Sequence, residues 1–330
     1  MTKIGILGAG AWGTALACVA ARAGNDVTLW EYDPELAKTI ERDRTNAQFL
    51  PGVDLEPSIR VTNDKIKTID ADAVLIVAPA QVVRSVTGDL QDHWKPGVPA
   101  ILCSKGIEND SLKFMNEVVA ETLPNAPVAV LSGPTFAIEV ARNMPAAATL
   151  ATEDAGLQET LCNALSTSHF RLYRSGDVIG AEIGGVVKNV LAIACGIAQG
   201  RGLGDNARAA LITRGLAEII RLGLAMGGTR ETFAGLSGIG DLTLTCNAMQ
   251  SRNFSLGVSL GEGESLEDVL GARITVAEGV FSASALNKLA DKMNIQMPIC
   301  RAVDQVLNQS ADIDTTISTL LARTPAHEHT

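Results

Sequence analysis

Short apolar runs rich in β-branched residues alternate with helical stretches over the first part of the chain. Seven runs predict strands, at Ile4–Leu7, Val27–Trp30, Ala73–Ala78, Ala100–Cys103, Val128–Leu131, Ala147–Thr152 and Phe170–Tyr173. The alanine-rich stretch Trp12–Ala23, followed by Gly24, predicts a helix closed by a left-handed glycine. Asp33 and Pro34 begin the next helix as N-cap and first helical residue. This alternation is typical of parallel βαβ units.

After residue 177 the pattern changes to long apolar helical periodicity. Two long helices are expected, Val178–Gly200 and Asn206–Met226, followed by shorter helices up to about Leu321. The chain is therefore predicted to have an α/β domain over residues 1–177 and an all-helical domain over 178–330. No internal repeat or low-complexity linker separates them, so we expect the domains to share an extensive interface with the active site between them.

The composition indicates a folded enzyme or binding protein. Of the 330 residues, 46% are hydrophobic and 19% are charged, and the formal net charge is -10. An acidic chain has no overall attraction for nucleic acid or acidic membranes, so any anion must be held locally. The N-terminus lacks the apolar segment of a signal peptide, and the window Ile183–Ala198 is too short to span a membrane. We therefore expect a cytoplasmic protein with no nucleic-acid partner and no stable membrane insertion.

The cysteines and histidines are not arranged as metal ligands. The six cysteines are scattered without CxxC spacing, so we expect reduced, buried thiols. His93 and His169 lie outside glycine-rich loops, and His327 and His329 lie in a polar C-terminal tail. No histidine has a second ligand at metal-binding spacing, so we expect neither a metal site nor a catalytic histidine.

The segment Gly8–Gly13 has the GxGxxG spacing of a dinucleotide-binding turn. It follows a predicted strand and begins a predicted helix, which is the context that the motif requires. Gly8 permits the tight turn, Gly10 lets the backbone approach a pyrophosphate, and Gly13 lets helix and strand touch. Helix-terminal amides around Ala11 and Trp12 would hold the diphosphate. The first domain is therefore predicted to be Rossmann-type and to bind NAD(H) or NADP(H).

The end of the second predicted strand indicates which dinucleotide is bound. Glu31 and Asp33 both lie at about the spacing expected for an acid that contacts the adenosine ribose. Asp33 is better explained as the N-cap before Pro34, which leaves Glu31 as the candidate. A carboxylate at this place would accept hydrogen bonds from the ribose and repel a 2′-phosphate, which favours NAD(H) over NADP(H).

Lys188 is the only charged residue between Ile183 and Ala198, within an apolar helical run. Partial desolvation lowers the pKa of an ammonium group toward the working pH. Such a group can take a proton from an alcohol and return it to a carbonyl. The alternative is a lysine that snorkels to solvent or forms an ion pair. Lys188 is the candidate proton carrier.

Polar residues after turns and strands are candidates for substrate binding. Asp241 follows a glycine-rich turn and is either a functional acid or a helix N-cap. Ser251–Asn253 presents a guanidinium and an amide at a helix start, which suits a phosphate, although Arg252 could also be an ordinary surface residue. Lys105 and the segment Ser132–Glu139 follow predicted strands at the carboxyl ends, where open α/β sheets bind ligands. We expect these loops to line the nicotinamide cleft.

Taken in order, these motifs resemble the bacterial NAD-dependent glycerol-3-phosphate dehydrogenase family. The resemblance runs from Ile4 to about residue 310 and rests on six segments: Gly8–Thr14, Ser104–Gly106, Leu131–Ala137, Gly185–Asn189, Gly238–Leu242 and Ser251–Asn253. It implies interconversion of sn-glycerol 3-phosphate and dihydroxyacetone phosphate with NAD(P)H, which supplies glycerol 3-phosphate for phospholipid biosynthesis. It also implies a cytoplasmic homodimer.

The resemblance implies roles for individual residues. Lys188 matches the family's proton acceptor, and Asp241 would orient or tune it. Positions that match substrate contacts are Lys105, Gly133, Thr135, Lys188, Asn189, Asp241, Thr245, Ser251, Arg252 and Asn253. Positions that match dinucleotide contacts are Trp12, Tyr32, Lys105, Ala137, Arg252, Val276 and Glu278. Lys105 and Arg252 would therefore touch both ligands.

Two departures from the family and two alternative functions bear on this interpretation. Ala11 stands where many members carry serine, which removes a hydroxyl contact but leaves the backbone donors. Glu31 and Tyr32 stand where NADPH-using members tend to have a small residue and a histidine, so the coenzyme preference is not carried over. The alternatives are a β-hydroxyacid dehydrogenase, with a carboxylate in place of the phosphate, and a non-catalytic dinucleotide-sensing regulator. Lys188 and the pair Arg252–Asn253 argue against the regulator.

Overall fold

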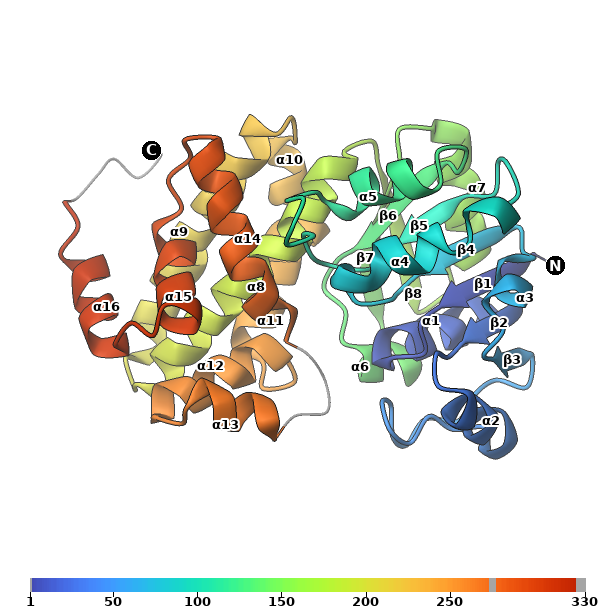
Figure 1. Ribbon diagram of the computed structural model, residues 1–330, viewed down its shortest axis with the longest axis horizontal. Helices are drawn as coiled ribbons and strands as arrows, with labels where there is room; N and C mark the ends of the chain where they lie inside the picture. The colour runs from blue at the N-terminus through green and yellow to red at the C-terminus, as the bar shows by residue number, and fades with distance from the viewer. Residues whose placement is uncertain (1, 273–276, 325–330) are drawn as a thin grey trace. The chain divides into compact units, whose positions relative to one another are not determined.

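The computed structural model describes residues 2–272 and 277–324 and divides the chain into two compact units (Figure 1). The α/β unit consists of Met1–Ser104 and Phe114–Val178, and the helical unit of Lys105–Lys113 and Ile179–Thr330. The segment Lys105–Lys113 thus packs with the helical unit, although it falls within residues 1–177, which were predicted to form the first domain. This placement depends on a contact between residues far apart in the sequence: the Lys105 ammonium forms an ion pair with Asp241 of the helical unit.

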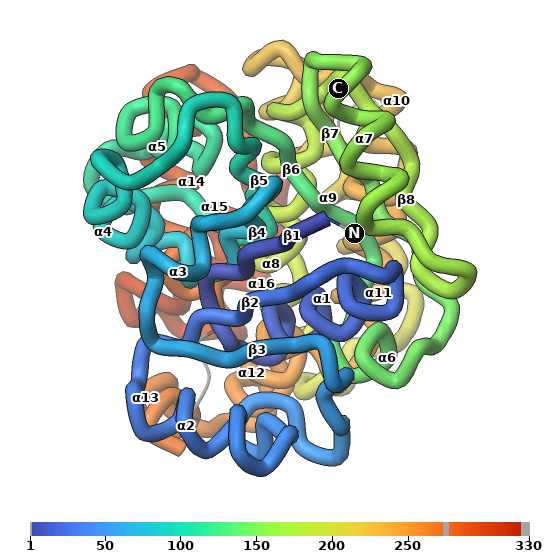
Figure 2. Tube along the Cα trace, turned by 90° about the vertical axis from the view of Figure 1, so that its right-hand side faces the viewer, coloured from blue at the N-terminus to red at the C-terminus, as the bar shows by residue number. Residues whose placement is uncertain are grey.

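An eight-stranded sheet forms the centre of the α/β unit, in the order β3-β2-β1-β4-β5-β6-β7-β8 (Figure 2). Its strands are β1 (Lys3–Leu7), β2 (Asp26–Trp30), β3 (Ile59–Thr62), β4 (Ala73–Ile76), β5 (Ala100–Leu102), β6 (Val128–Ser132), β7 (Ala146–Ala151) and β8 (Phe170–Ser175). The first six strands are parallel in the Rossmann order, which confirms the predicted fold class.

Two features of the sheet differ from the prediction. β3 was not expected, because this edge strand buries only Ile59 and Val61 and is too short to give a clear apolar run. β7 pairs antiparallel with β6, whereas parallel units were expected throughout. The apolar run of a buried strand reads the same in both directions, so its direction is decided by the path of the chain in three dimensions.

Helices cover both faces of the sheet, with α3, α4 and α5 on one side and α1, α6 and α7 on the other (Figure 2). Their bounds are α1 (Ala11–Arg22), α2 (Pro34–Asp43), α3 (Lys65–Ile69), α4 (Val83–Gly88), α5 (Met115–Thr122), α6 (Ala137–Ala141) and α7 (Ala155–Leu165). Gly24 has a φ of 89°, as expected after the first helix. Asp33 caps α2 by accepting hydrogen bonds from the amides of Glu35 and Leu36. Both local predictions are confirmed.

The helical unit contains no strand among residues 179–272 and 277–324, so the predicted all-helical second part is confirmed there. Its elements are α8 (Val178–Gly200), α9 (Gly204–Ala225), α10 (Arg230–Phe233), the π-helix η3 (Leu236–Gly240), α11 (Asp241–Asn247), α12 (Arg252–Glu262), α13 (Leu266–Gly271), α14 (Glu278–Lys292), α15 (Pro298–Asn308) and α16 (Ile313–Leu321).

The central helix α8 is the core of the helical unit. It has 23 residues and is long and apolar enough to cross a membrane, but 83% of its most apolar window is buried within the folded chain. The length argument from Ile183–Ala198 was therefore wrong, because the helix extends beyond that window at both ends. Burial instead identifies α8 as a core helix. A Cβ at Gly196 would lie 2.1 Å from the Phe254 carbonyl oxygen, so α8 and α12 pack backbone against backbone.

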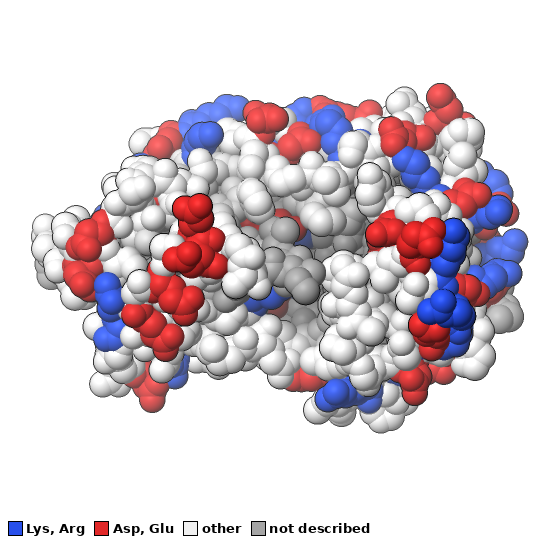
Figure 3. All heavy atoms as spheres, turned by 60° about the horizontal axis from the view of Figure 1, so that its bottom comes forward, with Lys and Arg blue, Asp and Glu red and all other residues white. Residues whose placement is uncertain are grey.

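Charged side chains are mixed on the surface. On the face shown in Figure 3, Lys and Arg side chains are interspersed with Asp and Glu side chains and form no continuous basic band. The six cysteines are free thiols, and all are buried except the partly buried Cys162. Because the chain is acidic overall, an anion has to be bound by a few donor groups that lie close together.

Candidate active site

The turn between β1 and α1 has the backbone geometry that a pyrophosphate requires. Gly8 has a φ of 118°, in the left-handed region, and a Cβ at Gly13 would lie 1.8 Å from the Gly8 carbonyl oxygen. A Cβ at Gly10 would meet nothing within 4 Å, so this side of the turn is open. The N-cap residue of α1 is Gly10, which has no side chain to accept hydrogen bonds from the first amides of the helix, next to Ala11 and Trp12. The residues present therefore fit a dinucleotide phosphate.

Asn46 supports this turn, and no motif in the sequence predicts its role. Its side chain is fully buried, and its Nδ2 donates hydrogen bonds to the Ala9 carbonyl at 2.7 Å and to Thr14 Oγ1 at 2.9 Å. Asn46 follows α2 and is 37 positions from Ala9, so no local pattern indicates the contact. It holds the glycine turn in place from outside the motif.

The two acids after β2 have different surroundings. Leu7 pairs with Trp30, so β1 and β2 end side by side and Glu31 lies near the glycine turn. Glu31 is 8% exposed, and its Oε1 accepts a hydrogen bond from the Asp33 amide at 3.0 Å. Burial raises the pKa of Glu31. Tyr32 is exposed, with its ring edge-on to Trp30. The ribose contact of Glu31 stays a prediction.

Lys188 and Lys105 share one buried carboxylate in the helical unit. Lys188 Nζ lies 2.5 Å from Asp241 Oδ1, and Lys105 Nζ lies 2.6 Å from Asp241 Oδ2. Lys188 is 7% exposed and Asp241 is 1% exposed. Asp241 is the first residue of α11 rather than its N-cap, because the N-cap position falls on Gly240. The carboxylate is thus committed to the two lysines and not to helix capping.

Burial and neighbouring charges lower the pKa values of both Lys188 and Asp241. Burial lowers the pKa of Lys188 to about 8, and the positive charge of Lys105 acts in the same direction, while Asp241 opposes both. Burial alone would raise the pKa of Asp241, but the charges of Lys105 and Lys188 outweigh it and lower that pKa. Asp241 therefore stays ionised, and Lys188 can exchange a proton near neutral pH.

Thr245 completes the surroundings of the Lys188 ammonium. Its Oγ1 lies 2.9 Å from Lys188 Nζ and also donates to the Asp241 carbonyl at 2.6 Å. Because residues 241 and 245 are four apart on α11, both side chains face α8. Lys188 is thereby held in one orientation by α11.

Asn189, beside Lys188, is linked through Asn253 of α12 to the start of α14. Asn253 Nδ2 donates to Asn189 Oδ1 at 3.0 Å, and Asn253 Oδ1 accepts from the Gly279 amide at 3.0 Å. Ser251 is the N-cap of α12, accepting from the Phe254 amide at 3.2 Å. Arg252, exposed in the first turn of α12, interacts electrostatically with Glu278 at the start of α14. The predicted helix start at Ser251–Asn253 is confirmed.

The remaining predicted residues lie elsewhere. Gly133, Thr135 and Ala137 belong to the α/β unit, and Gly133 has a φ of 155°. Thr135 Oγ1 donates a hydrogen bond to the Gly133 carbonyl at 3.2 Å. Val276 lies outside the described residues, as do His327 and His329. Among the described residues, no three His, Cys, Asp or Glu side chains are grouped as a metal site would need.

A phosphate-accepting glycine turn in a Rossmann sheet and a buried lysine held by a carboxylate are the parts of a nicotinamide-dependent dehydrogenase. Two family models match this chain: the NAD-dependent glycerol-3-phosphate dehydrogenase N-terminus over residues 3–158 and the corresponding C-terminus over residues 177–318. The chain belongs to the NAD-dependent glycerol-3-phosphate dehydrogenase family. It is an NAD(P)-dependent oxidoreductase, as the resemblance implied.

Proteins that match nearly the whole length of this chain are named glycerol-3-phosphate dehydrogenases. The NAD(P)+ glycerol-3-phosphate dehydrogenase of Caulobacter vibrioides is 54% identical over 321 residues, which are 97% of each chain. That of Parvibaculum lavamentivorans is 53% identical and covers 97% of this chain and 96% of its own. The crystal structure of glycerol-3-phosphate dehydrogenase from Coxiella burnetii is similar with a TM-score of 0.94 at 39% identity, covering 98% of this chain and 99% of that one. These similarities favour this family over a β-hydroxyacid dehydrogenase or a non-catalytic regulator.

Proposed function

We propose that this protein interconverts sn-glycerol 3-phosphate and dihydroxyacetone phosphate with NAD(H) or NADP(H). The observation that carries the proposal, beside the family, is Lys188, a buried lysine with a pKa of about 8 that is fixed by Asp241 and Thr245. A bound nicotinamide supplies or accepts a hydride at its C4 atom. The protein must then supply or accept the matching proton.

Lys188 moves this proton. In reduction, its ammonium donates a proton from Nζ to the ketone oxygen as hydride reaches the carbon, and the product is the secondary alcohol. In oxidation, the neutral amine takes the hydroxyl proton. A pKa near the working pH makes both forms of Lys188 available, which is the condition for efficient general acid–base catalysis. Asp241 keeps the amine from becoming too weak a base, and Thr245 limits its rotation.

The start of α12 is the proposed phosphate site. Backbone amides of a helix N-terminus, the Arg252 guanidinium and the Asn253 amide are suitable donors for a phosphate. Asn253 is linked to Asn189, the neighbour of Lys188, so the phosphate would be held at a fixed place relative to the proton carrier. Fixing a remote group in this way orients the reacting carbonyl. Lys105, Gly133, Thr135 and Ser251 are the further substrate contacts proposed from the resemblance.

The glycine turn with Ala11 and Trp12 is the proposed pyrophosphate site, and Glu31 is the proposed ribose contact. Its carboxylate favours NAD(H), because it would repel the 2′-phosphate of NADP(H). Tyr32, Lys105, Ala137, Arg252, Val276 and Glu278 are proposed as further dinucleotide contacts. We further propose a cytoplasmic homodimer that supplies glycerol 3-phosphate for phospholipid synthesis; free thiols are typical of proteins of a reducing compartment.

The proposal is tested by measuring dihydroxyacetone phosphate reduction with NADH and NADPH side by side. We expect turnover with both and a higher kcat/KM for NADH; a ratio that favours NADPH by about tenfold or more would refute the role of Glu31. Lys188→Met should lower kcat by at least ~10²-fold with little change in NADH affinity. Lys292→Met, which removes an exposed lysine of α14, is the matched control. Near-full activity of Lys188→Met would exclude it as the proton carrier.

A further inference from the structure

The carbonyl of Ala9 is a buried acceptor within the glycine turn. Ala9 is 1% exposed, and its oxygen accepts hydrogen bonds from Asn46 Nδ2 at 2.7 Å and from Thr14 Oγ1 at 3.2 Å. Asn46 Nδ2 also donates to Thr14 Oγ1 at 2.9 Å, so the three groups form a closed set of hydrogen bonds. Asn46 and Thr14 are both fully buried. Side chains therefore fix the orientation of the peptide that follows Ala9.

The hydrogen-bonding partners of Asn46 determine how its amide is oriented. Asn46 Oδ1 accepts a hydrogen bond from the Phe49 amide at 3.2 Å, whereas Nδ2 faces two acceptors. Exchanging the oxygen and the nitrogen would place an acceptor against the Ala9 carbonyl and a donor against the Phe49 amide. Asn46 therefore acts as a double donor toward the turn.

The segment that carries Asn46 is held at its base and in its middle. It connects α2 to β3, and its Leu50 side chain is buried in the core of the α/β unit. At the base of the segment, Arg44 Nη2 donates to the carbonyls of Glu56 and Ile59 at 2.7 and 2.8 Å. A loop with buried side chains and linked ends needs little ordering when a ligand binds. Asn46 is thus in place without a dinucleotide.

The contact with Asn46 determines where the Gly10 amide points. The peptide between Ala9 and Gly10 is trans and planar, so its N–H points away from its carbonyl. The carbonyl points to the buried Asn46, and the Gly10 N–H therefore points to the opposite side. Gly10 is exposed, and a Cβ there would meet nothing within 4 Å. The Gly10 amide is a donor on the open side of the turn, where a phosphate oxygen would bind.

We propose that Asn46 is a positioning residue for the dinucleotide: by holding the Ala9 carbonyl, it aims the Gly10 amide at the pyrophosphate. The inference rests on the dinucleotide site proposed above. Asn46 acts through the turn, because its side chain is enclosed and its hydrogen bonds go to protein groups. Without Asn46 the peptide can turn away from the phosphate although the GxGxxG sequence is intact. Ligands with the pyrophosphate should therefore depend on Asn46, and ligands without it should not.

The inference is tested by fluorescence titration of the full chain with NADH. Displacement of NADH is then measured with ADP-ribose, which keeps the pyrophosphate, and with adenosine, which lacks it. Asn46→Ala should raise the dissociation constants of NADH and ADP-ribose about tenfold, the loss expected for one hydrogen bond to a charged group. The dissociation constant of adenosine should stay close to the wild-type value. At saturating NADH, the KM for dihydroxyacetone phosphate should also be unchanged.

Asn25→Ala is the matched control. Asn25 is 4% exposed, and its Nδ2 donates to the carbonyls of Ala20 and Ala164 at 2.9 and 2.7 Å. It thus makes the same kind of contact, at the opposite end of α1 from the glycine turn. Urea titration should show similar losses in the free energy of unfolding for Asn25→Ala and Asn46→Ala. Only Asn46→Ala should lose affinity for NADH.

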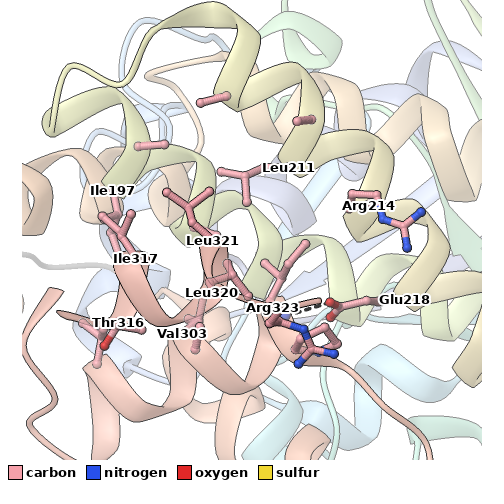
Figure 4. A pocket seen from close by; sticks show the side chains of 18 of the residues that line it. Ile197, Leu211, Arg214, Glu218, Val303, Thr316, Ile317, Leu320, Leu321 and Arg323 are labelled. Carbon is pink, nitrogen blue, oxygen red and sulfur yellow. Dashed lines mark hydrogen bonds between the residues drawn. The ribbon is translucent and has the colours of Figure 1, made fainter. Parts of the chain in front are cut away.

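A second control lies in the helical unit. The Glu218 carboxylate lines an aliphatic cavity of about 1160 Å³ (Figure 4), and none of the residues that line this cavity belongs to the α/β unit. Glu218 accepts hydrogen bonds from the amides of Ile299 and Cys300 at 2.7 and 3.1 Å. Glu218→Ala should lower the free energy of unfolding and leave the dissociation constant of NADH unchanged. This variant separates loss of stability from loss of the Gly10 donor.

Thr14→Val keeps the test decisive if Asn46→Ala does not fold. It removes one of the two hydrogen bonds to the Ala9 carbonyl and keeps the other, so the dissociation constant of NADH should rise about threefold. Wild-type affinity in Thr14→Val, or equal losses for NADH and adenosine in Asn46→Ala, would overturn the positioning role. So would a loss of NADH affinity in Asn25→Ala as large as that in Asn46→Ala. A wild-type chain that does not bind NADH would instead overturn the dinucleotide site itself.

Discussion

Replacing Lys105 by methionine should shift the pH dependence of the reaction toward higher pH. Reduction requires the ammonium form of Lys188, so kcat/KM of the wild-type protein should be constant at low pH and fall as pH rises through about 8. Lys105⁺ disfavours a second positive charge beside it. Lys105→Met removes this repulsion, which raises the pKa of Lys188 and moves the midpoint upward.

The magnitude follows from the contacts of Asp241. The two ammonium groups bind different oxygens of one carboxylate, at 2.5 and 2.6 Å, so they lie a few ångströms apart. Two unit charges about 4 Å apart interact by about 4 kcal/mol at an effective dielectric constant of about 20. That energy corresponds to about 3 pKa units. Water that enters the space left by the lysine head group reduces the effect, and we expect a rise of at least about 1 unit.

The assay is kcat/KM for dihydroxyacetone phosphate reduction as a function of pH, which reports the free enzyme. Lys105→Met should also lower the height of the profile, because Lys105 is a proposed ligand contact, but the midpoint does not depend on that height. Lys292→Met should keep the wild-type midpoint. An unchanged or lower midpoint in Lys105→Met would refute both the electrostatic coupling and the assignment of the titrating group to Lys188.

Three further outcomes test the fold and the site. Gly13→Ala should lower the free energy of unfolding, measured by urea titration, by about 1–3 kcal/mol, since its Cβ would lie 1.8 Å from the Gly8 oxygen. Gly10→Ala should keep the free energy of unfolding and weaken NADH binding, measured by fluorescence titration. Equal losses of stability in the two variants would contradict the geometry of the turn. Glu218→Ala leaves two buried amides without their acceptor and should cost about 2 kcal/mol or more in urea unfolding, with Glu218→Gln retaining part of it. Burial raises the pKa of Glu218 above its unfolded value, so in wild type its contribution to stability should fall as pH rises through that folded pKa, a dependence that Glu218→Gln should lack.

Local sequence patterns were sufficient for the parts of this protein that depend on short spacings. The βαβ alternation, the turn at Gly8–Gly13, the Asp33 cap and the helix α8 each follow from residues a few positions apart, whose side-chain period or backbone freedom is set by one element. The lone charge of Lys188 in an apolar run also singled it out. The resemblance added the order of these motifs, which indicated the substrate.

Tertiary structure decided what depends on distant residues. Lys188 and Asp241 are 53 positions apart, and Lys105 and Asp241 are 136 apart, so no local pattern shows that both lysines share one carboxylate. The same holds for Asn46 at the glycine turn and for the direction of β7. Sequence periodicity reports which face of an element is buried, but the partner on that face depends on how the chain packs. For this reason Lys188 could be named from the sequence, whereas the surroundings that lower its pKa could not.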